Sequence, residues 1–74
     1  MSRPDTTIGF YREKLKISQQ KIADILGIPR TTMSFYETKR EFPILAIAEK
    51  IAEILNVPIG KLYSQEELEV IKTK

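Results

Sequence analysis

The sequence predicts a compact all-α fold of five helices, forming one domain over residues 1–74. Three observations favour this fold. Apolar residues recur with the spacing of amphipathic helices along most of the chain, and residues that cap or end helices separate these stretches. The chain is also short, and short packed helices suit a small core best because small domains bury a low fraction of their surface. We expect the core in residues 6–63 and a short C-terminal helix or tail in residues 64–74.

The first predicted helix covers about residues 7–15. Ile8, Tyr11 and Leu15 recur at helical spacing. Gly9 weakens this helix slightly, because glycine loses more backbone entropy than other residues when it becomes helical.

A second predicted helix begins after Ser18, whose hydroxyl can accept a hydrogen bond from the first backbone N–H groups of the helix. Ile22, Ala23 and Leu26 then share one face. Gly27 ends the helix, because glycine takes the positive φ needed just past a helix C-terminus without steric strain.

A third predicted helix follows at once. Pro29 pre-sets φ for its first turn, and Met33 and Tyr36 form its inward face. Its outward side chains are Arg30, Thr31, Ser34 and Phe35. Because only residues 27–29 connect the two helices, these must cross steeply, and the small Ala23 lets them approach closely. This is the geometry of a helix-turn-helix, whose second helix enters the major groove of DNA while the first crosses the phosphate backbone.

The fourth predicted helix opens at Pro43 and continues to about Leu55, where Asn56 and Pro58 end it. A short fifth helix near Pro58 is expected to place Leu62 in the core.

Beyond this point, Ser64 and Glu67 have the spacing of a capping box. This spacing predicts one or two further helical turns before the C-terminal lysines.

The fourth helix has more apolar surface than one small core requires. Its expected inward stripe consists of Leu45, Ala48, Ile51, Ala52 and Leu55. Ile44, Ile47 and Ile54 widen this stripe to about half the circumference. The isoleucines either pack beneath the terminal segments, against Phe42, Leu68 or Ile71, or form a homodimer interface.

Residues 18–37, SQQKIADILGIPRTTMSFYE, show a more specific resemblance. Ala23, Gly27 and Met33 stand where the motif has a small residue, a turn glycine and a flexible apolar residue. Over roughly residues 8–63 the chain resembles the lambda-repressor, Cro and Xre family. The resemblance implies a sequence-specific transcriptional regulator, of the phage or bacterial repressor type. It also implies a homodimer that binds a palindromic double-stranded DNA operator, since members commonly dimerise near the fourth helix.

The outward face of the third helix is expected to read the bases, through Arg30, Thr31, Ser34 and Phe35. The guanidinium of Arg30 suits a bidentate hydrogen bond to guanine, with a phosphate contact as the alternative. Phe35 is suited either to cover a thymine methyl group or to lie against the following loop near Phe42.

Phosphate contacts are expected from Lys21, Thr32, Lys39 and Arg40, with a solvated side chain as the alternative for Lys21. The resemblance implies that Gln19 contacts both a phosphate and the first residue of the recognition helix, with a simple preference for the helix start as the alternative. Thr32 has an intrahelical hydrogen bond as its alternative. Relatives frequently have Asn-Gly where this chain has Thr38 and Lys39, which leaves the loop conformation open.

Arg12 and Glu37 occupy positions where many relatives pair an arginine of the first helix with a glutamate that ends the recognition helix. We interpret them as a structural ion pair, because removing one member of a buried pair leaves an uncompensated charge.

The net charge of +2 is too small to indicate nucleic-acid binding alone, but it is unevenly distributed. Residues 1–40 contain eight Lys and Arg against four Asp and Glu, whereas residues 41–74 contain four against six. The basic half includes the helix-turn-helix, which suits attraction to phosphate. A solvated helix surface is the alternative interpretation.

Cysteine and histidine are absent from the sequence. Their absence excludes disulfides, thiolate metal sites, most zinc sites and the usual nucleophile-base pairs. We therefore expect no enzymatic activity, no cofactor and no metal. The absence of cysteine also suits a reducing cytoplasm, so a cytoplasmic protein is expected. No membrane partner is expected, because no apolar run reaches the roughly 18 residues of a membrane span.

The alternative function is an antitoxin-like or adaptor protein that binds a protein partner through the fourth helix and the tail.

Overall fold

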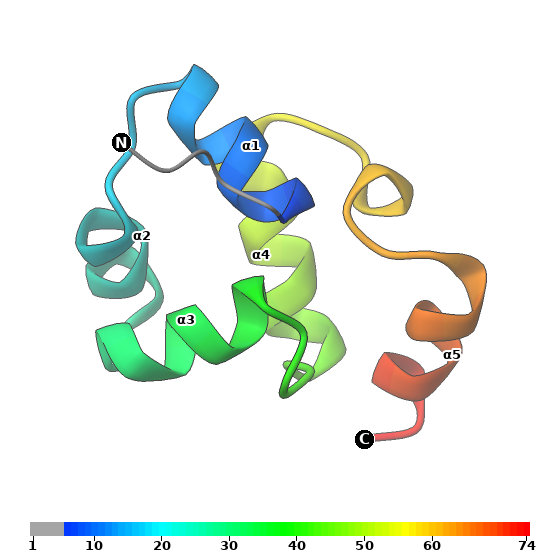
Figure 1. Cartoon of the computed structure of the whole chain (residues 1–74). Helices are drawn as coiled ribbons and strands as arrows, with labels where there is room; N and C mark the ends of the chain where they lie inside the picture. The colour runs from blue at the N-terminus through cyan, green and yellow to red at the C-terminus, as the bar shows by residue number, and fades with distance from the viewer. Residues whose placement is uncertain (1–5) are drawn as a thin grey trace.

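The computed structural model describes residues 6–74, and within this range it confirms the all-α fold (Figure 1). The described helices are α1 (Thr7–Lys14), α2 (Gln19–Leu26), α3 (Arg30–Glu37), α4 (Leu45–Leu55), the 3-10 helix η1 (Ile59–Lys61) and α5 (Gln65–Lys72). Residues 1–5, which the predicted domain range includes, lie outside the described part of the chain.

The helix-end signals account for most of these boundaries. The Ser18 hydroxyl accepts a hydrogen bond from the Lys21 backbone N–H at 3.0 Å. Gly27 follows α2 with φ of 71°, and Asn56 follows α4 with φ of 59°, so both take the left-handed conformation that ends a helix. Ser64 and Glu67 form both hydrogen bonds of the predicted capping box at the start of α5.

Two proline positions differ from the prediction. Pro29 and Pro43 lie before their helices instead of in the first turn. Pro29 is the N-cap of α3, with ψ of 150°. α4 starts two residues after Pro43, because Ile44 is also extended, with ψ of 161°. The Pro43 ring is buried in the core instead.

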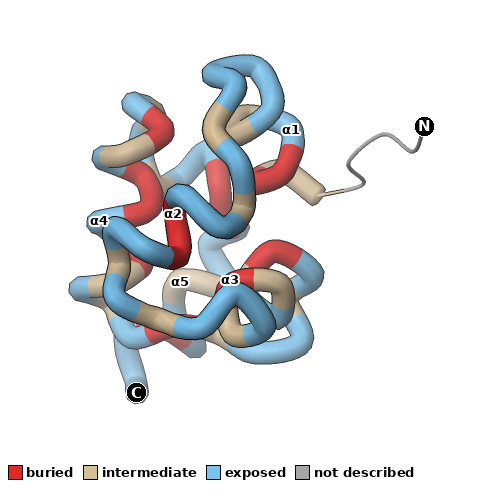
Figure 2. The backbone as a smooth tube through the Cα atoms, turned by 90° about the vertical axis from the view of Figure 1, so that its left-hand side faces the viewer, coloured by how far each residue is buried: buried red, intermediate tan, exposed pale blue. Residues whose placement is uncertain are grey.

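α4 passes through the middle of the molecule behind α1, with α2 on one side and η1 and α5 on the other (Figure 1). The buried core residues come from all five α-helices and from the end of η1, and Figure 2 shows where they lie along the backbone. The largest fully buried side chains are Ile8, Ile22, Met33, Ile51, Leu55, Leu62 and Ile71. Leu62 is thus in the core as predicted, whereas Leu15 is 47% exposed because it lies past the end of α1.

None of the helices in the described residues has the length and apolar character needed to span a membrane.

Candidate nucleic-acid interface

α2 and α3 pack directly against each other across the turn formed by residues 27–29. Ala23 has no exposed surface, which allows the close approach of the two helices. The backbone N–H of Gly27 donates to the Asp24 carbonyl at 3.2 Å, and that of Ile28 donates to the Ala23 carbonyl at 3.0 Å. These bonds satisfy carbonyls at the end of α2 and set the direction in which α3 starts.

α3 presents its predicted outward face to solvent. Arg30 and Thr31 are exposed, Phe35 is 41% exposed, and Ser34 is half-buried. On the opposite side Met33 is fully buried, which anchors the helix to the core.

The Phe35 ring has no close aromatic partner in the following loop. The Phe42 ring instead packs edge-on against Tyr63, with ring centroids 6.2 Å apart. Phe35 is therefore a partly exposed apolar side chain on the outward face of α3.

Arg30 and Gln19 are joined across the first turns of their helices. The Arg30 Nη1 donates a hydrogen bond to the Gln19 Oε1 at 3.1 Å. This is the contact that the family resemblance implied between Gln19 and the first residue of α3. The bond restricts the guanidinium at the N-terminal end of α3, the end that faces base edges in a helix-turn-helix.

The predicted phosphate-contacting residues differ in how accessible they are. Lys21 and Arg40 are exposed, and Thr32 and Gln19 are half-buried. Lys39 is also half-buried, and its ammonium is paired within the protein. Its Nζ lies 2.8 Å from the Glu67 Oε1 and 5.4 Å from the centroid of the Tyr63 ring.

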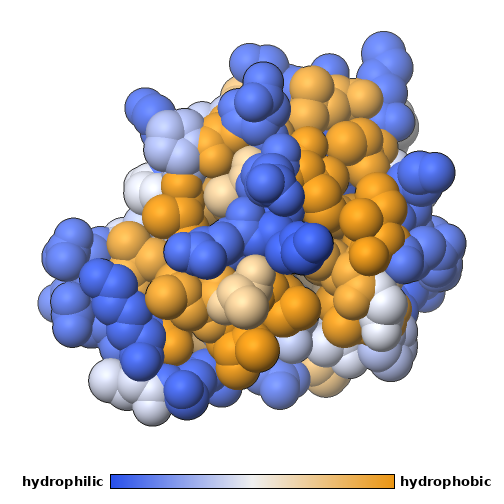
Figure 3. Space-filling view, turned by 180° about the vertical axis from the view of Figure 1, so that it is seen from behind, coloured by the Kyte–Doolittle hydropathy of each residue, from blue (hydrophilic) through white to orange (hydrophobic). Residues whose placement is uncertain are grey.

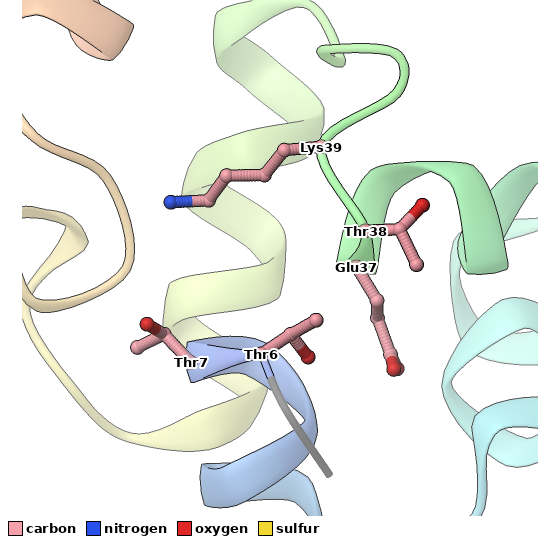
Figure 4. A pocket seen from close by; sticks show the side chains of 5 residues that line it. All are labelled: Thr6, Thr7, Glu37, Thr38 and Lys39. Atoms are coloured by element: carbon pink, nitrogen blue, oxygen red, sulfur yellow. The ribbon is translucent and has the colours of Figure 1, made fainter.

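The Lys39 side chain leaves the loop after α3 from an unusual backbone conformation. Lys39 has φ of 61°, a left-handed conformation that lysine adopts only at some cost. From there the side chain extends away from Thr38 towards the C-terminal segment, while Glu37 points towards α1 (Figure 4). Together with Thr6 and Thr7, these three residues line a pocket between the start of α1 and the end of α3. Sequence reasoning missed the Lys39–Glu67 pair, because its only signal for Glu67 was the capping box.

Arg12 and Glu37 form the ion pair at the end of α3. The Arg12 Nε donates to the Glu37 Oε2 at 2.7 Å, and the Nη2 donates to the Oε1 at 3.4 Å. The Nη1 also donates to the Ile17 carbonyl at 3.1 Å. The two side chains are 14% and 7% exposed, respectively. The pair therefore ties α1 and the following loop to the end of the recognition helix.

The three isoleucines predicted to form a dimer interface have different environments. Ile47 and Ile54 are half-buried against the core, which favours the alternative that they pack within the molecule. Ile44 is 55% exposed. Seen from behind, the surface has hydrophobic areas on both sides of a hydrophilic strip (Figure 3). On the exposed side of α4 the residues are Ala46, Glu49, Lys50 and Glu53.

The comparison with protein families agrees with this geometry. A helix-turn-helix domain model matches residues 7–68, which include all of α1 to α4. The chain belongs to the helix-turn-helix family. The predicted family is thereby confirmed at this level, and a phage repressor among the relatives is consistent with the Cro and Xre type.

The helix-turn-helix relatives include both short and long proteins. An HTH-type transcriptional regulator of Archaeoglobus fulgidus is 32% identical over 65 residues, covering 88% of this chain and 92% of that protein. An HTH-type transcriptional regulatory protein of Methanocaldococcus jannaschii is 40% identical over 50 residues, but these make up 68% of this chain and only 16% of the relative. The cryptic phage CTXphi transcriptional repressor RstR of Vibrio cholerae is 30% identical over 59 residues, covering 80% of this chain and 53% of RstR. The helix-turn-helix match and these relatives support a DNA-binding transcriptional regulator.

Proposed function

We propose that this protein is a sequence-specific repressor that binds a palindromic DNA operator as a homodimer, with α3 in the major groove. The observation that carries the proposal is the arrangement of α3. Met33 holds one face of the helix in the core, while Arg30, Thr31 and Phe35 leave the opposite face accessible. A helix anchored on one side and exposed on the other can enter a groove without unfolding the domain.

In this proposal the residues divide into two classes. Side chains on the outward face of α3 read base edges, and these are Arg30, Thr31, Ser34 and Phe35. Side chains at the start of α2 and around α3 bind phosphates, and these are Gln19, Lys21, Thr32 and Arg40. Lys39 is a cation at the same edge, but its ammonium is paired with Glu67.

Replacing Arg30 by alanine is expected to weaken binding to the preferred site by about 1–3 kcal/mol and to weaken binding to unrelated DNA much less. A bidentate contact with guanine carries sequence information, whereas a phosphate contact does not. The preferred site is obtained by selection from a random DNA pool, and affinities for it and for random duplex are then compared by titration. Arg40→Ala is the matched control, because it removes an exposed arginine that we assign to phosphate and should weaken both complexes alike. Equal losses on both DNAs for Arg30→Ala would mean that sequence is read elsewhere.

Phe35 provides a second test of base reading. Replacing thymine by uracil in each half-site removes the methyl group that we expect the exposed ring to cover. The native protein should then bind more weakly, while Phe35→Ala should bind the two DNAs nearly equally. Fluorescence anisotropy gives the affinity of each protein for each duplex, and the four values give the coupling between the Phe35 ring and the thymine methyl group. If the native protein binds the thymine and uracil duplexes equally well, Phe35 does not read the methyl group.

A further inference from the structure

The carboxylate of Glu67 holds the Lys39 ammonium at the end of the recognition helix. The distance from Nζ to Oε1 is 2.8 Å, and the two side chains are 29% and 26% exposed, respectively. The same Oε1 accepts a hydrogen bond from the Ser64 backbone N–H at 2.8 Å. The carboxylate is therefore fixed by the helix cap, and the Tyr63 ring lies 5.4 Å from the ammonium. These contacts link α5 to the residues that follow α3.

Glu67 remains charged at neutral pH. Burial acts to raise its pKa, but the hydrogen bonds from Lys39 and from Ser64 outweigh this effect and lower the pKa below its ordinary value. The carboxylate beside the Lys39 ammonium is thus an anion at neutral pH.

The position of Lys39 makes this pairing relevant to DNA. Lys39 lies two residues past the end of α3, and the next residue, Arg40, is exposed. With α3 in the major groove, the chain leaving the helix comes close to the sugar-phosphate backbone. Carboxylate and phosphate oxygens offer an ammonium the same charge-assisted hydrogen bond. The ammonium has three N–H donors but only one positive charge, so a carboxylate that already neutralises this charge weakens its attraction to a phosphate.

We propose that Glu67 withholds Lys39 from DNA phosphate, so that α5 lowers the affinity of the recognition surface for any DNA sequence. This inference rests on the proposed function. It makes Glu67 a positioning residue that acts through Lys39, and it makes Lys39 a phosphate contact that becomes available only when the pair is broken.

The test is Glu67→Gln, which removes the charge but keeps a side chain suited to the capping box. Binding to a random-sequence duplex is measured over a series of salt concentrations. We expect about two- to fivefold tighter binding per subunit, the range of a partly exposed ion pair. The log-log salt slope should steepen by about 0.9 per subunit, because one more phosphate is neutralised. Glu66→Gln is the matched control, since it makes the same charge change in the first turn of α5 without a contact to Lys39.

Lys39→Ala supplies the second variant. On our proposal it leaves the salt slope of the native protein unchanged, and in the Lys39→Ala background Glu67→Gln has no more effect than Glu66→Gln. A flatter slope for Lys39→Ala would show that Lys39 already binds phosphate, and equal effects of the two glutamine variants in the native background would also overturn the inference. If the inference about Lys39 fails in either way but Arg30→Ala and Arg40→Ala still weaken DNA binding, the proposed function stands. If neither does, the proposed function itself fails.

Discussion

Replacing Ile44 by lysine is expected to separate the proposed homodimer and to weaken operator binding by about a hundredfold or more, because the second half-site is then no longer held at high effective concentration. Ile44 is 55% exposed at the start of α4, so the substitution should leave the fold of each subunit intact. Ile47 and Ile54 are poorer probes, since both pack against the core and a lysine there would also cost folding energy. Sedimentation equilibrium measures the association, and titration with the selected operator measures the binding.

Ile25→Lys is the matched control for this substitution. Ile25 is 54% exposed on α2, so the same change is made at the same exposure on another helix. Dissociation by Ile44→Lys but not by Ile25→Lys would support an interface at the start of α4. A native protein that sediments as a monomer at high concentration would defeat the dimer proposal. A soluble monomer that also binds no DNA would favour the alternative of a protein partner for this surface.

Replacing Glu37 by alanine is expected to lower the free energy of unfolding by about 2–3 kcal/mol. The expected loss is below that of a fully buried pair, because the remaining Arg12 is 14% exposed and can be partly hydrated. Chemical denaturation followed by circular dichroism gives the value. Glu13→Ala on α1 is the control, since this exposed carboxylate lies next to Arg12 in the sequence and should change stability by about 0.5 kcal/mol or less.

A loss for Glu37→Ala no larger than that for Glu13→Ala would mean that the ion pair adds no net stability. The Arg12 bond to the Ile17 carbonyl would then be enough to satisfy the guanidinium. In either case, the measurement concerns the link between α1 and α3 and does not depend on DNA binding.

The local structure of the helix-turn-helix could be predicted from the sequence because it depends on interactions between residues close along the chain. The Ser18 cap, the left-handed Gly27 and the buried Met33 each follow from side-chain chemistry and helical periodicity. The outward face of α3 follows from the same periodicity. The start of α4 was predicted too early, because proline suits both a first helical turn and the extended segment before it.

Pairs that are distant in the sequence were harder to predict. The contact between Arg12 and Glu37 was suggested only by the family resemblance. The pairing of Lys39 with Glu67 had no sequence signal, because it depends on where η1 places α5 relative to the end of α3.

The sequence by itself determined the helices, the turn between α2 and α3 and the side chains that α3 turns outward, since these depend on dihedral preferences and hydrogen bonds within a few residues. Only the tertiary structure decided which environments were taken up by residues of the same type or the same charge. Ile47 and Ile54 are partly covered while Ile44 is exposed, and Arg40 is exposed while Lys39 is bound to a carboxylate. The physical reason is that burial and ion pairing are set by which surfaces meet when the helices pack, and helical periodicity carries no information about residues on other helices.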